Sequence, residues 1–260
     1  MADLPAVVKR LAGKQDTQKA YCCMMEVPTP WPQALCQCRD WITDNLGRHV
    51  EGYHLELENG DVVGHLYYAL SEQALFPYEV ESGFAILYCD WIQTRYQGKG
   101  FGRRLFDSFL SDMRGGGIKG VLVEGTDIEG QMHFEQYQKR GFKQVYTRGH
   151  SVLLYLPISE DEVEIMPLKG HIHHRKGVPV VIQILNGYMC PYDVSTQIIL
   201  RQVAGEYGDQ VIVKDTWLTA ETLQEFGVAK GIFINGRQKL SGAETEEAIR
   251  QAILEEINRA

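Results

Sequence analysis

The stretch from Phe84 to Met113 allows few choices of fold. Phe84 to Ile92 is a near-continuous apolar run, which is typical of a strand buried on both faces of a sheet. A glycine-rich turn, Gln97 to Gly102, comes next. The following segment carries apolar residues at helical spacing: Leu105, Phe106, Phe109, Leu110 and Met113. This order predicts a strand, a tight turn, and an amphipathic helix that packs back onto its own sheet.

The residues on either side predict a mixed α/β domain. Asn59-Gly60 lies between two runs of alternating polarity and should supply both positive-φ residues of a hairpin turn. Gly47 and Gly141 each follow a predicted helix, where glycine is the usual C-terminal cap. The predicted strands are Ala20–Met25, two within Tyr53–Leu70, Ile118–Val123 and Val152–Leu156, and the further helices are Leu35–Leu46 and Gln131–Arg140.

The pattern breaks after this region. Residues 158–177 hold an acidic run, two glycines, and His171, His173 and His174, and we interpret them as a linker with a short strand at Val163–Met166. The three histidines could bind a metal ion, but a solvated linker is the favoured interpretation.

Residues 178–260 then give the order β-α-β-α-β-β-α, with helices at Cys190–Ala204, Ala220–Phe226 and Ala243–Ile257. That order is the order of a thioredoxin-like domain. The predicted organisation is therefore a first domain over residues 1–157, the linker, and a second domain over 178–260.

Composition limits the function. The chain has 260 residues, of which 44% are hydrophobic and 23% charged, and a net charge of −8. The acidic balance argues against general nucleic-acid binding. No run approaches the roughly 20 apolar residues of a membrane span, and the N-terminus lacks a secretory apolar core. We expect a cytoplasmic protein whose six cysteines are free thiols.

The glycine-rich turn has the chemistry of an anion site. A turn between a strand and a helix exposes backbone N–H groups, and the helix N-terminus adds the positive end of its dipole. Glycine lets the backbone approach a diphosphate closely, and Lys99, Arg103 and Arg104 add positive charge. A plain strand-to-helix turn is the alternative. A P-loop is set aside because no Gly-Lys-Ser/Thr is present, and a dinucleotide-binding turn because the loop lies in mid-domain.

Two motifs in register carry a resemblance to a family. Gln97-x-x-Gly100-x-Gly102 resembles motif A of the GNAT superfamily of N-acyltransferases, and apolar Ile92 stands where that family ends its central strand. Tyr137, four residues before Gly141-Phe142, resembles motif B. The resemblance covers roughly residues 18–157 and implies a split, V-shaped sheet with acetyl-CoA between two parting strands.

The resemblance also implies roles. The backbone amides of Gln97, Gly98, Lys99, Gly100, Phe101, Gly102 and Arg103 would hold the CoA diphosphate. The pantetheine arm would pair with the backbone near Asp90 to Ile92. Tyr137 would protonate the leaving thiolate as a general acid. The alternative is that Tyr137 is an aromatic residue of the core with no catalytic role. Asp90, Glu124, His133 or a water molecule could be the base, and Gly130 replaces an asparagine common in the family.

Cys190 is a candidate thiol site in the second domain. Cys190-Pro191 at a strand-to-helix turn resembles a thioredoxin or glutaredoxin active site, where the helix N-terminus favours the thiolate. However, Asp193 replaces the second cysteine and should raise the pKa of Cys190, and Lys230 stands near the position of the expected cis-proline. A binding or scaffolding role is therefore favoured over monothiol chemistry.

The combination of the two domains resembles the YoaP-like acetyltransferases. Two local motifs also resemble that group: the adjacent pair Cys22-Cys23, and Cys89-Asp90-Trp91-Ile92 before the glycine-rich loop. The predicted function is acetyl transfer from acetyl-CoA to an amine on a small molecule, peptide or protein. A CoA-binding sensor without catalysis and a redox protein acting through Cys190 are the alternatives. We expect no metal, because Cys22 and Cys23 would point to opposite faces of a strand, and Cys36 and Cys38 to different faces of a helix. The sequence indicates neither the acceptor nor an oligomeric state.

Overall fold

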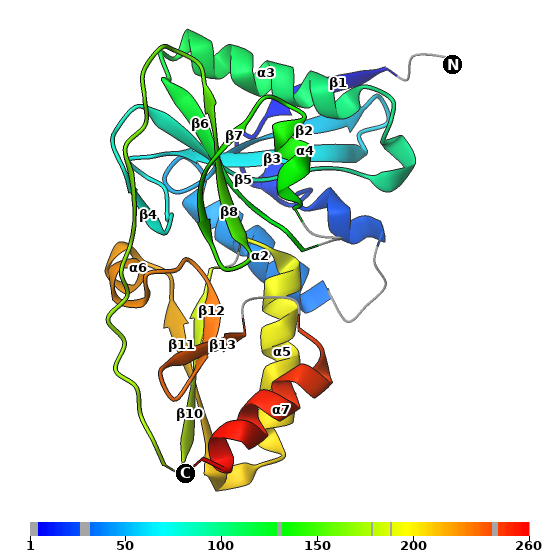
Figure 1. Cartoon of the computed structure of the whole chain (residues 1–260). Coiled ribbons are helices and arrows are strands. Elements are labelled where there is room, and N and C mark those ends of the chain that lie inside the picture. The colour runs from blue at the N-terminus through cyan, green and yellow to red at the C-terminus, as the bar shows by residue number, and fades with distance from the viewer. Residues whose placement is uncertain are drawn as a thin grey trace. The chain divides into compact units, whose positions relative to one another are not determined.

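A computed structural model describes residues 5–26, 32–128, 132–177, 179–187, 189–240 and 244–259 (Figure 1). The chain divides into two compact units. The first unit includes Ile42–Ala74 and Val80–Ile165, together with the N-terminal segment. The second includes Met166–Ala260 with two short earlier segments, Pro28–Trp41 and Leu75–Glu79.

A seven-stranded sheet forms the first unit, in the order β1-β2-β3-β5-β6-β8-β7. Every neighbouring pair is antiparallel except β5 and β6, which are parallel. The parallel pair needs a crossover connection, and α3 supplies it. The strands are β1 (Ala6–Arg10), β2 (Glu51–Leu57), β3 (Val62–Leu70), β5 (Phe84–Ile92), β6 (Gly120–Thr126), β7 (Lys143–Arg148) and β8 (Ser151–Pro157), and the crossover helix is α3 (Phe101–Gly115).

The parallel pair separates toward its carboxyl ends. Residues of β5 and β6 are partners only as far as Leu87 and Val123, although β5 continues to Ile92 and β6 to Thr126. A β-bulge lies at this point, because Tyr88 is the extra residue in the register between β3 and β5. A bulge bends its strand and increases the local twist, and so turns the end of β5 away from β6. The split sheet expected from the sequence is therefore present.

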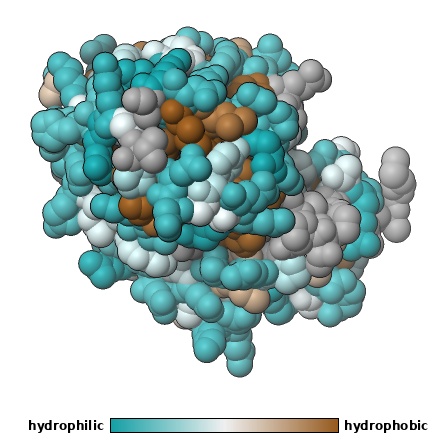
Figure 2. All heavy atoms as spheres, turned by 90° about the horizontal axis from the view of Figure 1, so that it is seen from below, coloured by the Kyte–Doolittle hydropathy of each residue, from teal (hydrophilic) through white to brown (hydrophobic). Residues whose placement is uncertain are grey.

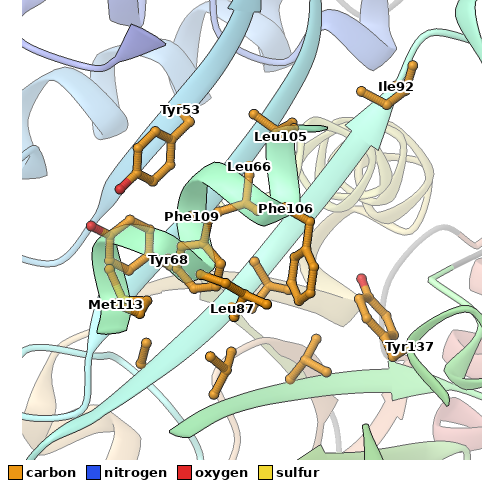
Figure 3. Packing of buried hydrophobic residues seen from close by; sticks show 14 of the residues in the cluster. Tyr53, Leu66, Tyr68, Leu87, Ile92, Leu105, Phe106, Phe109, Met113 and Tyr137 are labelled. Carbon is orange, nitrogen blue, oxygen red and sulfur yellow. The ribbon is translucent and has the colours of Figure 1, made fainter. Parts of the chain in front are cut away.

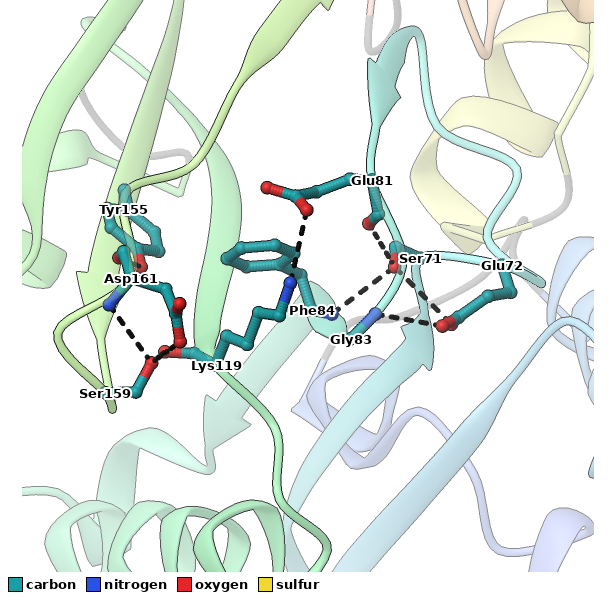
Figure 4. A network of polar contacts seen from close by, with 9 residues as sticks. All are labelled: Ser71, Glu72, Glu81, Gly83, Phe84, Lys119, Tyr155, Ser159 and Asp161. Atoms are coloured by element: carbon teal, nitrogen blue, oxygen red, sulfur yellow. Dashed lines mark hydrogen bonds and ion pairs between the residues drawn. The ribbon is translucent and has the colours of Figure 1, made fainter.

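The amino ends of the same two strands are fixed by polar contacts (Figure 4). Lys119, just before β6, forms a 3.1 Å ion pair with Glu81, just before β5. Its ammonium also lies 5.5 Å from the centre of the Phe84 ring. Ser71 donates a hydrogen bond to the Glu81 carbonyl and accepts one from the Phe84 amide. The strands are thus held together at one end and open at the other.

Helix α3 covers one face of the sheet with the apolar stripe predicted from the sequence (Figure 3). Phe109 is fully buried, and its ring centre lies 5.0 Å from that of Tyr68. Tyr53 reaches across the face and donates a 2.6 Å hydrogen bond to Asp112 of the helix. Because the stripe is anchored to β2, β3 and β5, the N-terminus of α3 is held at the open end of β5.

The second unit is built on a four-stranded sheet in the order β11-β10-β12-β13. β10 is parallel to β11 and antiparallel to β12, and it is buried on both faces, as its run of Val, Ile and Leu predicts. Leu200 of α5 and Ile249 of α7 pack with Ile184, whereas Phe226 of α6 packs with Leu185. The elements are β10 (Val180–Asn186), α5 (Pro191–Gly205), β11 (Val211–Trp217), α6 (Ala220–Phe226), β12 (Gly231–Ile234), β13 (Arg237–Leu240) and α7 (Glu246–Ile257), which is the predicted order.

A strap of chain, defined here as residues 168–177, runs along this second unit. The His171 amide donates to the carbonyl of Glu225, and the Arg175 amide to the carbonyl of Asn235, each at 2.9 Å. Gly170 lies so close to α6 that an added Cβ would stand 2.3 Å from the Phe226 carbonyl oxygen. This part of the predicted linker is therefore held by backbone contacts.

Several local predictions were wrong. Ala20–Met25 is not a strand, because Cys22–Glu26 forms a 3₁₀ helix, η1; the first strand is β1. The predicted helix over residues 131–140 is short: α4 spans Phe134–Gln138, and residues 129–131 lie outside the described part. Only Gly60 of the hairpin turn has positive φ, not Asn59. β7 was missed because exposed polar residues dominate it.

The remaining elements are α1 (Lys14–Thr17), α2 (Pro32–Asn45), η2 (Thr94–Tyr96), η3 (Gly208–Gln210), and β4 (Tyr78–Val80) paired with β9 (Ile165–Pro167).

No helix among the described residues has the length and apolar character that crossing a membrane requires. The face of the molecule in Figure 2 is mostly hydrophilic, with separate apolar patches.

The close approach of the strap predicts a steric effect on stability. Gly170→Ala should lower the free energy of unfolding by about 1–3 kcal/mol, because the new methyl group forces the strap away from the Phe226 carbonyl. Gly205→Ala is the matched control, since an added Cβ there meets no described atom within 4 Å. Urea unfolding measures both variants. Equal stability of the two would contradict the tight packing of the strap.

Candidate active site

The glycine-rich loop lies where β5 ends and α3 begins. Gly98 and Gly100 have φ values of 71° and 82°, a left-handed conformation that side chains with a Cβ rarely adopt. A Cβ added to either residue would meet no described atom within 4 Å. The loop is therefore exposed on the side where a ligand would lie, and its glycines are needed for its backbone shape.

The loop presents a set of backbone donors. The first helical hydrogen bond of α3 runs from the Arg104 amide to the Gly100 carbonyl, at 3.0 Å. The amides of Phe101, Gly102 and Arg103 precede that bond, so no carbonyl of the helix can accept from them. Together with the positive end of the helix dipole, they form an anion site suited to a diphosphate.

Gln97 and Ile92 fix the loop to the strand. The Gln97 side-chain amide donates a 2.9 Å hydrogen bond to the Ile92 carbonyl, which closes the turn onto the end of β5. Ile92 is buried, and its side chain would meet a Cβ of Gly102 at 3.6 Å. These two positions, expected to contact the cofactor, thus shape the loop that would bind it.

Positive charge gathers around the loop. Lys99, Arg103 and Arg104 are exposed, and none forms an ion pair within the described part of the chain. The Lys99 ammonium lies 5.1 Å from the centre of the Tyr96 ring, a cation–π contact that keeps it beside the turn. A locally basic surface is therefore present in a chain of net charge −8.

Tyr137 lies at the open end of the sheet and contacts Asp90. Its hydroxyl donates a 2.9 Å hydrogen bond to one carboxylate oxygen of Asp90, and Arg140 donates a 2.5 Å bond to the other. The Tyr137 side chain is 3% exposed. Burial, followed by the charge of Asp90, raises the pKa of Tyr137 well above its ordinary value. The phenol therefore keeps its proton at neutral pH and has it directed toward the splayed strand.

The three residues considered as the general base have different surroundings. Asp90 is occupied by Tyr137 and Arg140. Glu124 of β6 accepts a hydrogen bond from the Ser151 hydroxyl. His133 precedes α4, and its ring stacks at 4.9 Å on Phe134. The structure thus brings Asp90 to Tyr137, and leaves the other two in separate contacts. Arg140 was not predicted as a site residue, because a basic residue near the end of a helix is expected to interact with the negative end of the helix dipole.

A buried imidazole, also missed from the sequence, lies on β3. His65 is fully buried, and its ring stacks on Tyr67 at 4.6 Å. Its Nδ1 lies 3.2 Å from the Cys22 sulfur and its Nε2 3.6 Å from the Cys89 sulfur. Burial, with a smaller effect of His54, lowers the pKa of His65 to about 3, so the ring stays neutral. The one sign of it in the sequence is that His65 interrupts an otherwise apolar run from Val62 to Leu70.

Metal binding has no support in the described residues. They contain no group of three or more His, Cys, Asp or Glu side chains that could hold a metal ion. Cys22 and Cys89 face opposite nitrogens of one imidazole ring, so the three cannot converge on one ion. His171, His173 and His174 are exposed on the strap.

Cys190 caps α5 but is not activated. Pro191 occupies the first turn of the helix, as predicted, and Lys230 forms a 2.8 Å ion pair with Asp193. Burial and then the charge of Asp193 raise the pKa of Cys190 to about 11, against the opposing effects of Lys230 and nearby amides. The predicted effect of Asp193 is confirmed, and the thiol stays protonated at neutral pH.

Comparison with known families assigns the first part of the chain. Residues 17–142 match the model of the acetyltransferase (GNAT) family. This match spans the split strands, the loop and the Tyr137 helix described above. The segment is similar to the acetyltransferases of the GNAT family, which are acyltransferases. Members of the family bind acetyl-CoA or CoA as cosubstrate. A search of curated proteins gives no match.

Solved structures give matches of low identity. The ribosomal-protein-S18-alanine N-acetyltransferase of Escherichia coli is 18% identical, covers 61% of this chain and 97% of its own, and has a TM-score of 0.44. An acetyltransferase from Thermus thermophilus is 18% identical and has a TM-score of 0.46. The match covers 61% of this chain and 100% of the Thermus chain. The E. coli acetyltransferase YhbS, solved in complex with CoA, is 15% identical, with 61% and 84% coverage and a TM-score of 0.46. The assignment depends on the family match rather than on these scores.

The protonated state of Cys190 predicts how its reactivity depends on pH. With a pKa of about 11, its thiolate fraction rises about tenfold for each pH unit between 7 and 10. The rate of alkylation by iodoacetamide should follow the same slope without a plateau. Peptide mass spectrometry can follow Cys190 separately, with exposed Cys36 as a reference for the reagent. A plateau below pH 8 would show an activated thiol and contradict this assignment.

Proposed function

We propose that the protein transfers an acetyl group from acetyl-CoA to a primary amine by direct attack on the thioester. The observation that carries the proposal is the exposed loop from Gln97 to Arg103, next to a parallel strand pair that separates after Leu87 and Val123. The loop would bind the diphosphate, and the separated strands leave backbone groups for the pantetheine arm.

The residues fit a CoA diphosphate. The amides of Gly98, Lys99, Gly100, Phe101, Gly102 and Arg103 are the proposed donors. The Gln97 amide, also expected to bind the diphosphate, donates to the Thr94 carbonyl at 3.1 Å instead, and the Gln97 side chain holds the turn to Ile92. The pairing of β5 with β6 stops at Leu87, and β5 continues to Ile92, so amide groups of the pantetheine would follow this last part of β5 as an added strand does. In this proposal the thioester lies near Asp90.

Tyr137 is the proposed general acid. The acceptor amine attacks the thioester carbonyl, the carbon–sulfur bond breaks, and the CoA thiolate takes the phenol proton. The proton that the amine nitrogen loses returns to the Tyr137 phenolate through water, which restores the phenol. The phenol is protonated at neutral pH, and because burial and Asp90 raise its pKa and so weaken it as an acid, the opposing charge of Arg140 is what favours release of the proton. Arg140, whose guanidinium lies 5.7 Å from the Tyr137 ring centre, stabilises the phenolate left behind. Asp90 acts as a positioning residue that orients the hydroxyl before CoA binds.

A thioredoxin-like second domain over residues 178–260, joined by a linker over 158–177, is part of the proposal. Its support is the element order β10-α5-β11-α6-β12-β13-α7, with the parallel pair β10 and β11 and a cysteine at the start of α5. The likeness to the YoaP-like acetyltransferases has the same basis. Because the Cys190 thiol is protonated at neutral pH, we assign this domain to acceptor selection rather than to monothiol redox chemistry.

The proposed acceptor is an amine on a small molecule, peptide or protein. A reducing compartment such as the cytoplasm is favoured because all six cysteines are free thiols in the structure.

A charge placed in the loop tests cofactor binding. Gly102→Asp puts a carboxylate in the first turn of α3, where it favours the helix but repels a diphosphate. Gly102→Asn is the control of equal size, and the space at Gly102 admits both because Ile92 lies at ordinary contact distance. Isothermal titration with acetyl-CoA should show at least about tenfold weaker binding for the aspartate than for the asparagine. Equal affinities would show that the diphosphate binds elsewhere.

Removal of one hydroxyl group tests the proposed acid. Tyr137→Phe should reduce kcat by about 10–100-fold with little change in acetyl-CoA affinity, because the ring still packs on Phe142. Chromatographic release of CoA across a panel of amines measures turnover, and Tyr146→Phe, on exposed β7, is the control. Unchanged turnover would remove Tyr137 from the mechanism. Acetyl-CoA binding without turnover of any amine by the wild type would favour a CoA-binding sensor.

A further inference from the structure

A group of cations without acidic partners lies in the second unit. Arg175 and Lys176 belong to the strap, and Arg237 begins β13. All three are exposed, and none forms an ion pair with a described residue. In this they resemble the cations around the Gly98 loop. In a chain of net charge −8, such a concentration of uncompensated positive charge favours an anionic ligand.

The cations surround a hollow rather than a flat surface. Arg175, Lys176, Gly177, Asn235, Arg237, Glu256 and Arg259 line a space of about 330 Å³. Its walls come from the strap, the β12–β13 turn and the end of α7. A concave site of this kind fits a small molecule better than an extended polymer.

Asn235 gives the hollow a fixed polar group. Its side chain is 2% exposed and stands in the turn with a positive φ of 50°. The side-chain oxygen accepts a 3.0 Å hydrogen bond from the Val181 amide, which fixes the orientation of the carboxamide. Its NH₂ group has no partner among the described residues and is the donor available to a ligand in the hollow.

The negative groups near the hollow are neutralised by their own partners. Glu256 is the one carboxylate among the described lining residues, and it is paired with Arg259 at 3.2 Å and Lys239 at 3.4 Å. Lys239 also pairs with Glu255 at 3.0 Å. The carboxyl end of α7 carries a partial negative charge, which Arg259 offsets. The three exposed cations of the strap and β13 remain uncompensated.

We infer that this hollow is a second anion site, which binds a compact phosphate-bearing molecule through Arg175, Lys176, Arg237 and the Asn235 amide. Arginine suits a phosphate group because its planar fork can donate two parallel hydrogen bonds. The site lies wholly in the second unit, and it does not depend on acetyl transfer in the first.

Titration with inorganic pyrophosphate tests the inference. The background is Gly102→Asp, which removes the competing loop site of the first unit. Arg175→Gln and Arg237→Gln should each weaken pyrophosphate binding by about 5–10-fold. Asn235→Asp should abolish it, because the new oxygen still accepts from the Val181 amide while the donor becomes a negative charge. Lys214→Gln removes one exposed charge elsewhere in the unit and should change nothing.

The result that overturns the inference is absence of pyrophosphate binding in this background, or binding that Arg175→Gln, Arg237→Gln and Asn235→Asp all leave unchanged relative to Lys214→Gln. If circular dichroism shows that Asn235→Asp does not fold, the pyrophosphate affinities of the two arginine variants, compared with that of Lys214→Gln, still test the inference. A single-stranded oligonucleotide that binds more tightly than pyrophosphate at the same salt concentration would contradict a site for a compact ligand.

Discussion

The separation of two parallel strands is the constraint on which the candidate site depends. Parallel pairing of β5 and β6 stops at Leu87 and Val123, where Tyr88 forms a bulge against β3. At the other end, backbone pairing from Phe84 with Gly120 onward holds the strands together, and the exposed ion pair of Lys119 and Glu81 lies beside it. The opening is therefore fixed by backbone geometry, and α3 starts beside it because its apolar stripe is anchored to the same sheet.

The loop site could be predicted from sequence because its requirements are local. Glycines with positive φ at positions 98 and 100, a preceding apolar strand and a following amphipathic helix are all visible in consecutive residues. The order of elements in residues 180–257 was predictable for the same reason, since each has its own period and each strand its apolar run.

Features formed by residues far apart in the sequence were not predictable. The contact of Asp90 with Tyr137 and Arg140, and that of His65 with Cys22 and Cys89, depend on the register of the sheet. The interpretation of Ala20–Met25 as a strand was wrong because an apolar run alone does not distinguish a strand from other buried structure. Cys22–Glu26 folds as a 3₁₀ helix, and the Tyr21 amide donates a hydrogen bond to the Tyr67 hydroxyl. The contacts of the strap could not be predicted either, because a polar sequence does not show that its backbone will form hydrogen bonds with the rest of the second unit.

A crystal structure of the protein with CoA would show whether the loop and the separated strands bind the cofactor. We expect diphosphate oxygens within hydrogen-bonding distance of the amides between Gly98 and Arg103. The pantetheine arm should lie along β5 beyond Leu87, with the sulfur beside Tyr137. CoA bound away from the loop, or β5 and β6 paired to their carboxyl ends with no room between them, would rule out the proposed site.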